Sequence, residues 1–179
     1  MNKLNFGCGN GKLSGFINCD VDPEVKPDVL LDMTEVPYPF EENSASLIVC
    51  AHTIEHIEKR FHFAVLLEFA RILQKDGLLI LAYPEFTECA KNWLANKGGQ
   101  REFWESTILG RGTTVHDRHI SLMETIELSE SLIEVGFEQI HVSKETNQDF
   151  NTIVRAKKGT PLQTYEQALA GQFFATMKG

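Results

Sequence analysis

Three glycines alternate with other residues directly after the first strand-like run, in the order Gly7-Cys8-Gly9-Asn10-Gly11. Two acids, Asp20 and Asp32, stand at the ends of the next two strand-like runs. Glycine lets a ligand approach the backbone closely, and a carboxylate at a strand end can accept hydrogen bonds from both hydroxyls of a ribose. Because open α/β sheets bind ligands at the carboxyl ends of their strands, these residues predict a site for a nucleoside-type ligand.

The spacing of the glycines argues against a dinucleotide. The dinucleotide fingerprint is G-x-G-x-x-G opening a helix, with an acid about 20 residues further on. Here Lys12 replaces the last glycine, and residues 10–15 are too few to form a helix before the next strand. A pyrophosphate would therefore lose the helix N-terminus that normally anchors it. S-adenosylmethionine has an amino-acid tail, a ribose and an adenine but no phosphate, so it suits this turn better, with the tail at Gly7 and Gly9.

Strand-like and helical patterns alternate along the chain and must position these residues. The runs that predict strands are residues 3–6, 16–21, 27–31, 46–51, 78–82, 139–144 and 152–156. Helical spacing is expected over residues 53–74, 85–97, 125–135 and 161–177, and Gly77 is interpreted as a stop signal after the first of these. Residues 100–123 show little periodicity.

This alternation predicts an α/β fold with right-handed crossovers. We expect a doubly wound, mostly parallel Rossmann-like sheet of seven strands or slightly fewer. The last two strands have no helix between them and should form an antiparallel C-terminal hairpin. The expected organisation is one domain over residues 1–160 and a helical tail over residues 161–179.

The run from residue 4 to residue 86 resembles the class I S-adenosylmethionine-dependent methyltransferases, in particular the short subgroup whose glycine turn leads almost directly into the second strand. The segment LNFGCGNGKLSGFINCDVDP is similar to the first two motifs of that family. The segment LLEFARILQKDGLLILAYPEF resembles its helix, turn and fifth strand, and FNTIVRAKK resembles part of its final hairpin. The resemblance covers roughly residues 3–158 and implies a Rossmann-like methyltransferase domain.

The resemblance also implies roles for individual residues. Asp20 would bind the ribose, with Asp22 as the alternate, and Asp32 would meet the adenine amino group. Ala51 and His52 would lie near the sulfonium. The full set of cofactor-binding residues expected is Gly7, Cys8, Gly9, Asp20, Val21, Asp32, Met33, Ala51 and His52.

The histidines offer a competing chemistry. Residues 52–56 read H-T-I-E-H and match H-x-x-E-H, in which two histidines on one helix face share a zinc ion and the glutamate acts as general base. Because His52 directly follows a buried strand, we interpret His56 as a packing residue and expect no metal. His116, His119 and His52 are the candidates for a catalytic base, and the alternative for the first two is an ordinary surface loop.

Composition limits the choice of partners and compartment. The net charge of −8 disfavours a nucleic-acid partner, because an acidic surface repels phosphate. The longest apolar runs are far too short to span a membrane, and no signal region precedes the first strand. The four cysteines form no C-x-x-C pair, as expected of reduced thiols. We therefore expect a soluble, cytoplasmic protein.

Two function classes stay open beside zinc hydrolysis. The first is a methyltransferase that acts on a small-molecule or saccharide-type acceptor. The second is a non-catalytic adenosyl-binding or interaction module of the same fold, because the N-terminal helices that often cover the active site of this family are missing. A homodimer, or the tail over residues 161–179 with its stripe of Tyr165, Leu169, Phe173 and Met177, is expected to cover the pocket instead.

Overall fold

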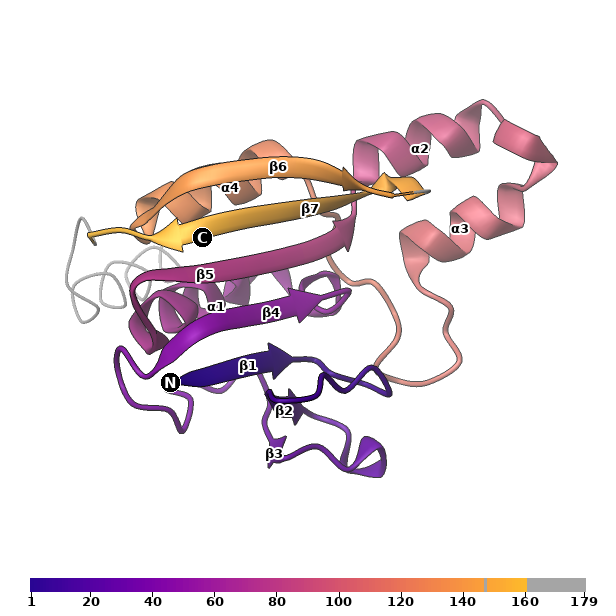
Figure 1. Cartoon of the computed structure of the whole chain (residues 1–179). Helices are drawn as coiled ribbons and strands as arrows, with labels where there is room; N and C mark the ends of the chain where they lie inside the picture. The colour runs from indigo at the N-terminus through magenta and orange to yellow at the C-terminus, as the bar shows by residue number, and fades with distance from the viewer. Residues whose placement is uncertain (147, 161–179) are drawn as a thin grey trace.

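A seven-stranded sheet forms the centre of the molecule in the computed structural model, which describes residues 1–146 and 148–160 (Figure 1). The strand order is β3-β2-β1-β4-β5-β7-β6. Strands β1 to β5 pair in parallel, and β7 lies antiparallel between β5 and β6. The strands are β1 (Asn2–Phe6), β2 (Ile17–Asp20), β3 (Val29–Leu30), β4 (Ala45–Ala51), β5 (Leu73–Pro84), β6 (Phe137–Glu145) and β7 (Gln148–Lys158). The expected mixed α/β sheet with an antiparallel C-terminal pair is confirmed.

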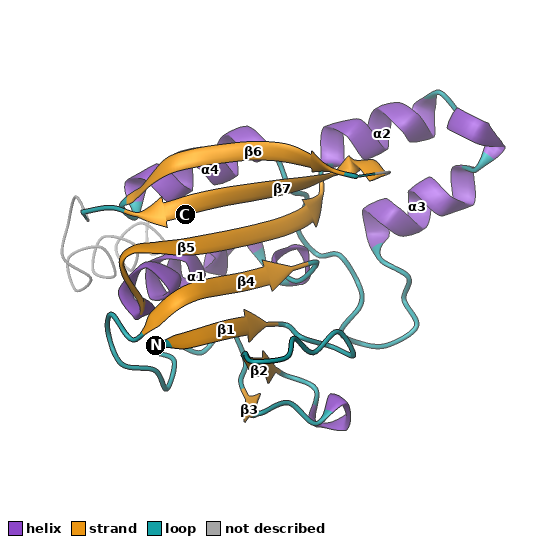
Figure 2. Ribbon diagram, in the orientation of Figure 1, coloured by secondary structure: helices purple, strands orange, loops and turns teal. Residues whose placement is uncertain are grey.

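Four α-helices accompany the sheet within the described residues: α1 (Lys59–Ile72), α2 (Phe86–Leu94), α3 (Arg101–Leu109) and α4 (Thr125–Glu134). Short 3₁₀ turns occur at Pro23–Val25, Ile54–His56 and Lys97–Gly99. Helices α1 and α4 lie behind the sheet in Figure 2, whereas α2 and α3 project beyond the ends to which the arrows of β4 and β5 point. The chain returns from α3 to α4 past the carboxyl ends of β1 and β4. The predicted ligand-binding edge therefore lies under this returning segment.

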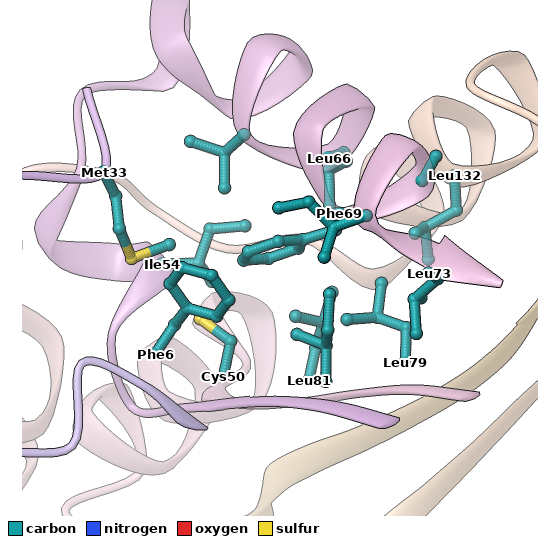
Figure 3. Close-up of a cluster of buried hydrophobic side chains, with 14 of the residues drawn as sticks. Phe6, Met33, Cys50, Ile54, Leu66, Phe69, Leu73, Leu79, Leu81 and Leu132 are labelled. Atoms are coloured by element: carbon teal, nitrogen blue, oxygen red, sulfur yellow. The ribbon is translucent and has the colours of Figure 1, made fainter. Parts of the chain in front are cut away.

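The core lies between the sheet and α1 (Figure 3). Phe69 of α1 packs against Phe6 of β1 with ring centroids 4.9 Å apart, and Tyr38 packs on Phe6 at 5.4 Å. Alternate residues of the central strands point into this core, as the two-residue period of a strand requires. They include Ile48, Cys50, Leu79 and Leu81, which are fully buried. This packing fixes β1 and β4, whose carboxyl ends carry the candidate site.

The helix predicted over residues 53–74 is shorter than expected. His52 adopts a left-handed conformation with φ of 52°, residues 54–56 form a 3₁₀ turn, and Ile57 is extended, so α1 begins only at Lys59. At its other end α1 passes into β5 at Leu73 without a loop. Gly77 is not a helix stop but part of β5, where a Cβ would lie 2.8 Å from the carbonyl oxygen of Gln74. Close backbone packing explains this glycine.

Helix α3 was not predicted, because residues 100–123 lack a clear apolar period. Tertiary contacts stabilise it instead: Trp104 and Phe103 meet Phe150 of β7 at 5.1 and 5.8 Å between ring centroids. The indole of Trp93 in α2 donates to Glu105 of α3 over 3.2 Å. The two helices therefore act as one hairpin that is attached to the sheet through aromatic side chains.

The remaining expectations concern the cysteines, membrane-spanning helices and the residues after 160. Cys8, Cys19, Cys50 and Cys89 are buried free thiols, as expected. Among the described helices none combines the length and apolar character that a membrane crossing requires. The predicted helix over residues 161–177, its apolar stripe and the proposed tail domain lie outside the described residues.

Candidate active site

The glycine turn is held by Asp20. One carboxylate oxygen of Asp20 accepts from the amide of Gly9 at 2.7 Å, and the other accepts from the amide of Asp22 at 2.9 Å. Gly7 and Gly9 both have positive φ, at 64° and 46°. A side chain on Gly7 would lie 2.2 Å from side-chain atoms of Thr53, whereas no atom lies within 4 Å of a side chain on Gly9. Gly7 is therefore needed for packing, and the space beside Gly9 is open to a ligand.

A pocket of about 500 Å³ opens beside this turn at the carboxyl ends of the strands. Seven of the nine predicted cofactor residues line it, namely Gly7, Gly9, Asp20, Val21, Asp32, Met33 and His52. The other two do not: Cys8 is buried under the turn, and Ala51 is the last residue of β4. Burial is the main cause of the raised pKa of the Cys8 thiol, and we interpret Cys8 as a packing residue.

The chemistry of this pocket fits S-adenosylmethionine. Asp20 presents a carboxylate at the end of β2, where ribose hydroxyls can donate to its remaining lone pairs. Asp32 uses Oδ1 to accept from the amide and hydroxyl of Thr34, both at 2.8 Å, and this holds the carboxylate at the rim. Leu31 and Met33 supply apolar surface for a flat ring. The volume is within the range of small-molecule sites.

Part of the lining of this first pocket was not predicted from the sequence. The segment from Thr114 to Ile120 contributes six lining residues, yet of these only His116 was singled out for the site. Thr53 was also missed, although its hydroxyl donates to the carbonyl of Ala51 at 3.0 Å and closes the floor below Gly7. No spacing rule connects these residues to the glycine turn, because the fold brings them there from distant segments.

A second pocket of about 740 Å³ adjoins the first. His52, His56 and Asp117 line both pockets and form the wall between them. The second pocket is lined by His52, Glu55, His56, Pro84, Phe103, Ser106, Thr107, Gly110, Arg111, Thr113, Asp117, His119, Glu145, Phe150 and Asn151. Most of these side chains are polar or charged. The second pocket therefore suits a hydrophilic molecule bound next to the first pocket.

The three candidate bases are separated by the structure. His52 lines both pockets, His119 lines only the second, and His116 lines only the first. Burial lowers the pKa of His119, and the nearby His56 lowers it further. The Glu55 carboxylate raises the pKa of His52, although its Oε1 atom is 3.6 Å from Nδ1, beyond hydrogen-bond length.

The H-x-x-E-H segment does not form the helix that a zinc peptidase needs. His52 directly follows β4 in a left-handed conformation, and Ile54–His56 is a single 3₁₀ turn. The two histidines therefore do not lie one helical turn apart on an α-helix. The donors that converge are instead Glu55, His56 and His119, whose ligand atoms all lie within 4.8 Å of one another.

Three aromatic residues of the α2–α3 hairpin, Trp93, Phe103 and Trp104, differ in their position relative to the pockets. Phe103 lines the second pocket, whereas Trp104 is buried behind it with its indole N–H on the carbonyl of Lys97 at 3.2 Å. Trp93 pairs with Arg101 at 5.3 Å and does not line either of these pockets. Of the three, only Phe103 is placed to contact a ligand.

Comparisons with known proteins agree with this fold. Residues 4–81 match the family model described as a methyltransferase domain. No curated protein matches the sequence. An S-adenosylmethionine-dependent methyltransferase from Archaeoglobus fulgidus aligns with a TM-score of 0.65 and 14% identity, over 88% of this chain and 86% of that one.

Two further solved structures show the same fold. A methyltransferase from Thermotoga maritima, described as a possible histamine N-methyltransferase, aligns with a TM-score of 0.60 and 17% identity, over 88% of this chain and 82% of that one. A methyltransferase from Methanosarcina mazei aligns with a TM-score of 0.60 and 14% identity, over 88% and 92%. Some other matching chains are longer, and this chain covers 63% and 47% of two of them.

The strand order, the glycine turn and the acid at the end of β2 define a class I methyltransferase fold. Residues 4–81 match the methyltransferase-domain model, and the chain as a whole shares the fold of solved class I S-adenosylmethionine-dependent methyltransferases. At these identities the solved structures establish the fold and leave the acceptor open.

Proposed function

We propose that this protein transfers a methyl group from S-adenosylmethionine to a small hydrophilic acceptor, of saccharide or similar polar type. The observation that carries the proposal is the junction of two pockets at His52, His56 and Asp117. One pocket has the glycine turn and the two acids suited to the cofactor, and the other has the volume and polar lining suited to an acceptor.

S-adenosylmethionine, when bound, supplies a methyl group already activated by its sulfonium. In this proposal Gly7 and Gly9 leave room for its amino-acid tail, Asp20 holds the ribose hydroxyls, and Asp32 faces the adenine. The protein's contribution is then to hold the acceptor in line and to keep water out, which can supply most of the rate enhancement of such a displacement.

His52 is our candidate for the residue that removes a proton from the acceptor. Its side chain is 47% exposed and lines both pockets, so it can reach a group placed between them. His116 has access to the cofactor pocket only, and His119 turns Nε2 towards Glu55 at 4.0 Å. A hydroxyl or ammonium acceptor would need such a base, because it must lose a proton as the new bond forms.

The non-catalytic module remains the alternative, because it shares the cofactor pocket and differs only in turnover. Zinc hydrolysis by His52 and His56 with Glu55 as base has weaker support, since these residues do not lie on one α-helix.

Calorimetric titration with S-adenosylmethionine and S-adenosylhomocysteine tests the cofactor assignment directly. A panel of saccharides, amines and hydroxy acids, with release of S-adenosylhomocysteine as the readout, then tests transfer. Binding with turnover on one class, lost in His52→Ala, supports the proposal. Tight binding without turnover on any class favours the non-catalytic module, and no binding of either ligand contradicts both.

A further inference from the structure

Within the part of the chain that the structure describes, Glu55 carries a buried carboxylate without a hydrogen-bond partner. The residue is 1% exposed, and both Oε1 and Oε2 are buried atoms that accept no hydrogen bond from these residues. The closest basic atoms are Nδ1 of His52 at 3.6 Å and Nε2 of His119 at 4.0 Å, both from Oε1. Leaving a carboxylate buried and unpaired is costly, so this position calls for a positively charged ligand.

Two imidazoles stand beside this carboxylate with their rings already fixed. Nδ1 of His56 lies 2.9 Å from the carbonyl oxygen of Arg118, and a carbonyl can only accept, so Nδ1 carries the hydrogen. Nε2 of neutral His56 is then left with a free lone pair. A histidine that ligates a metal almost always donates its other N–H in this way, which sets the tautomer and the ring orientation.

His119 completes the group from the opposite side. Its ring meets that of His56 edge to face, with centroids 4.8 Å apart. The segment that carries His119 is held to Glu55 itself, because the amides of Ile120 and Ser121 both donate to the Glu55 carbonyl, at 3.0 and 3.1 Å. The spacing between the three side chains is therefore built into the backbone.

We propose that Glu55, His56 and His119 bind one divalent transition-metal cation. Two imidazoles and one carboxylate are a known ligand set for such ions, with bonds of about 2.0 to 2.2 Å to zinc. The three donor atoms lie within 4.8 Å of one another, so small side-chain rotations bring them around a common centre.

The remaining coordination positions would face the acceptor pocket. All three ligands line that pocket, and His56 also lines the cofactor pocket. A cation here would bind an oxygen or nitrogen of the acceptor near the site of transfer. This role rests on the proposed function, whereas metal binding itself does not.

No metal was expected from the sequence, because the pair His52 and His56 was judged unfit to share an ion when His52 directly follows a buried strand. His119 is 64 positions from Glu55, and no spacing rule joins them. The folded arrangement is our reason to replace that expectation.

The test uses the full chain without S-adenosylmethionine, so that its outcome is independent of methyl transfer. Metal is removed with a chelator, and Zn²⁺ and Co²⁺ are titrated by calorimetry and by the visible absorption of bound Co²⁺. We expect about one ion per chain and a rise in melting temperature of about 5 to 10 °C when the metal is about 100 times its dissociation constant.

Three variants identify the ligands. Glu55→Gln and His119→Ala should each weaken metal binding by about 100-fold or more, whereas His141→Gln, an exposed histidine on β6, should bind as the wild type does. In chelator, Glu55→Gln should melt at or above the wild-type temperature, because an amide is cheaper to bury than an unpaired carboxylate. That result shows that the variant is folded and that its loss of binding is specific.

Two outcomes would overturn the proposal. One is that the wild-type protein binds neither ion stoichiometrically. The other is that binding survives His119→Ala but is lost in His52→Ala, which would place the ion on His52 and His56.

Discussion

The main-chain amide of Gly9 donates a 2.7 Å hydrogen bond to the carboxylate of Asp20, joining the glycine turn after β1 to the end of β2. The same carboxylate also lines the cofactor pocket. Asp20 thus shapes the turn and, in the proposed function, also offers acceptors to the ribose of the cofactor.

Replacing Asp20 by alanine should weaken binding of S-adenosylhomocysteine by tenfold or more. Charge-assisted hydrogen bonds to the ribose contribute about 1.5 to 3 kcal/mol, and the turn loses its anchor as well. Calorimetric titration measures the change. Asp76→Asn removes a charge from β5 at a residue that lines neither pocket and should leave the affinity as it was. An unchanged affinity in the Asp20 variant would refute its assignment.

The two glycines of the turn should differ in their tolerance of alanine. Gly9→Ala adds a side chain in open space at positive φ and should lower the free energy of unfolding by about 1 to 2 kcal/mol. Gly7→Ala suffers the same strain and also a collision with Thr53, so it should lose about 1 to 3 kcal/mol more. Urea denaturation of both variants checks the order. Equal losses would mean that the contact between residue 7 and Thr53 is relieved without cost.

A buried ion pair attaches the loop before β4 to α1. Arg71 and Glu68 are 2.8 Å apart, Glu68 accepts from the amide of Tyr38, and Arg71 donates to the carbonyls of Tyr38 and Phe40. Arg71→Met should lower the free energy of unfolding by about 3 to 5 kcal/mol, because it leaves a buried charge uncompensated.

The matched control for this pair is on α2. Lys91 and Glu88 have the same three-residue spacing at 2.9 Å, but both side chains are exposed. Lys91→Met should change the free energy of unfolding by less than about 1 kcal/mol. Similar losses in the two variants would mean that burial of the Arg71 pair has little effect on stability.

His62 should make the protein sensitive to acid. Burial lowers its pKa, with Lys59 acting in the same direction, while the carbonyls of Ile57 and Ile54 and the charge of Glu55 oppose the shift. The folded state therefore binds this proton less readily than the unfolded state. Its contribution is fully present above the unfolded pKa, which is about 6.5, and is lost as the pH falls below it.

The measurement is the free energy of unfolding between pH 7.5 and pH 5 for the wild type and His62→Gln. Glutamine can still donate to the Ile57 carbonyl, which Nε2 of His62 contacts at 2.9 Å, but it does not titrate. The variant should lose less stability on acidification than the wild type. Parallel pH profiles would show that protonation of His62 is equally easy in both states.

The sheet and the cofactor pocket could be predicted because they depend on local signals. The alternation of apolar runs indicated β1, β4 and β5, and Asp20 and Asp32 follow strands directly, so their place at one sheet edge follows from the fold class. Gly7 and Gly9 directly follow the first strand, so their place at this edge follows in the same way.

The second pocket could not be predicted, because its walls depend on contacts between distant residues. Helix α3 has no clear apolar period and is stabilised through Phe150, which lies 46 positions after Trp104. His119 is brought to Glu55 by two main-chain hydrogen bonds whose donors carry no signal in the sequence. The start of the helix expected from residue 53 was wrong, because His52 takes a left-handed conformation and residues 54–56 form a 3₁₀ turn before α1 begins at Lys59.

The order of the last strands has a consequence for synthesis on the ribosome. Strand β6 is an edge strand that pairs with β7, and β7 is also the strand that covers the free edge of β5. Residues 148–158 are among the last described residues to leave the ribosome, so β6 emerges with no strand available to pair with. Until then the nascent chain exposes the edge of β5, an apolar strand open to pairing with other chains. Completion of β7 is therefore the event that both joins β6 to the sheet and ends this period of exposure.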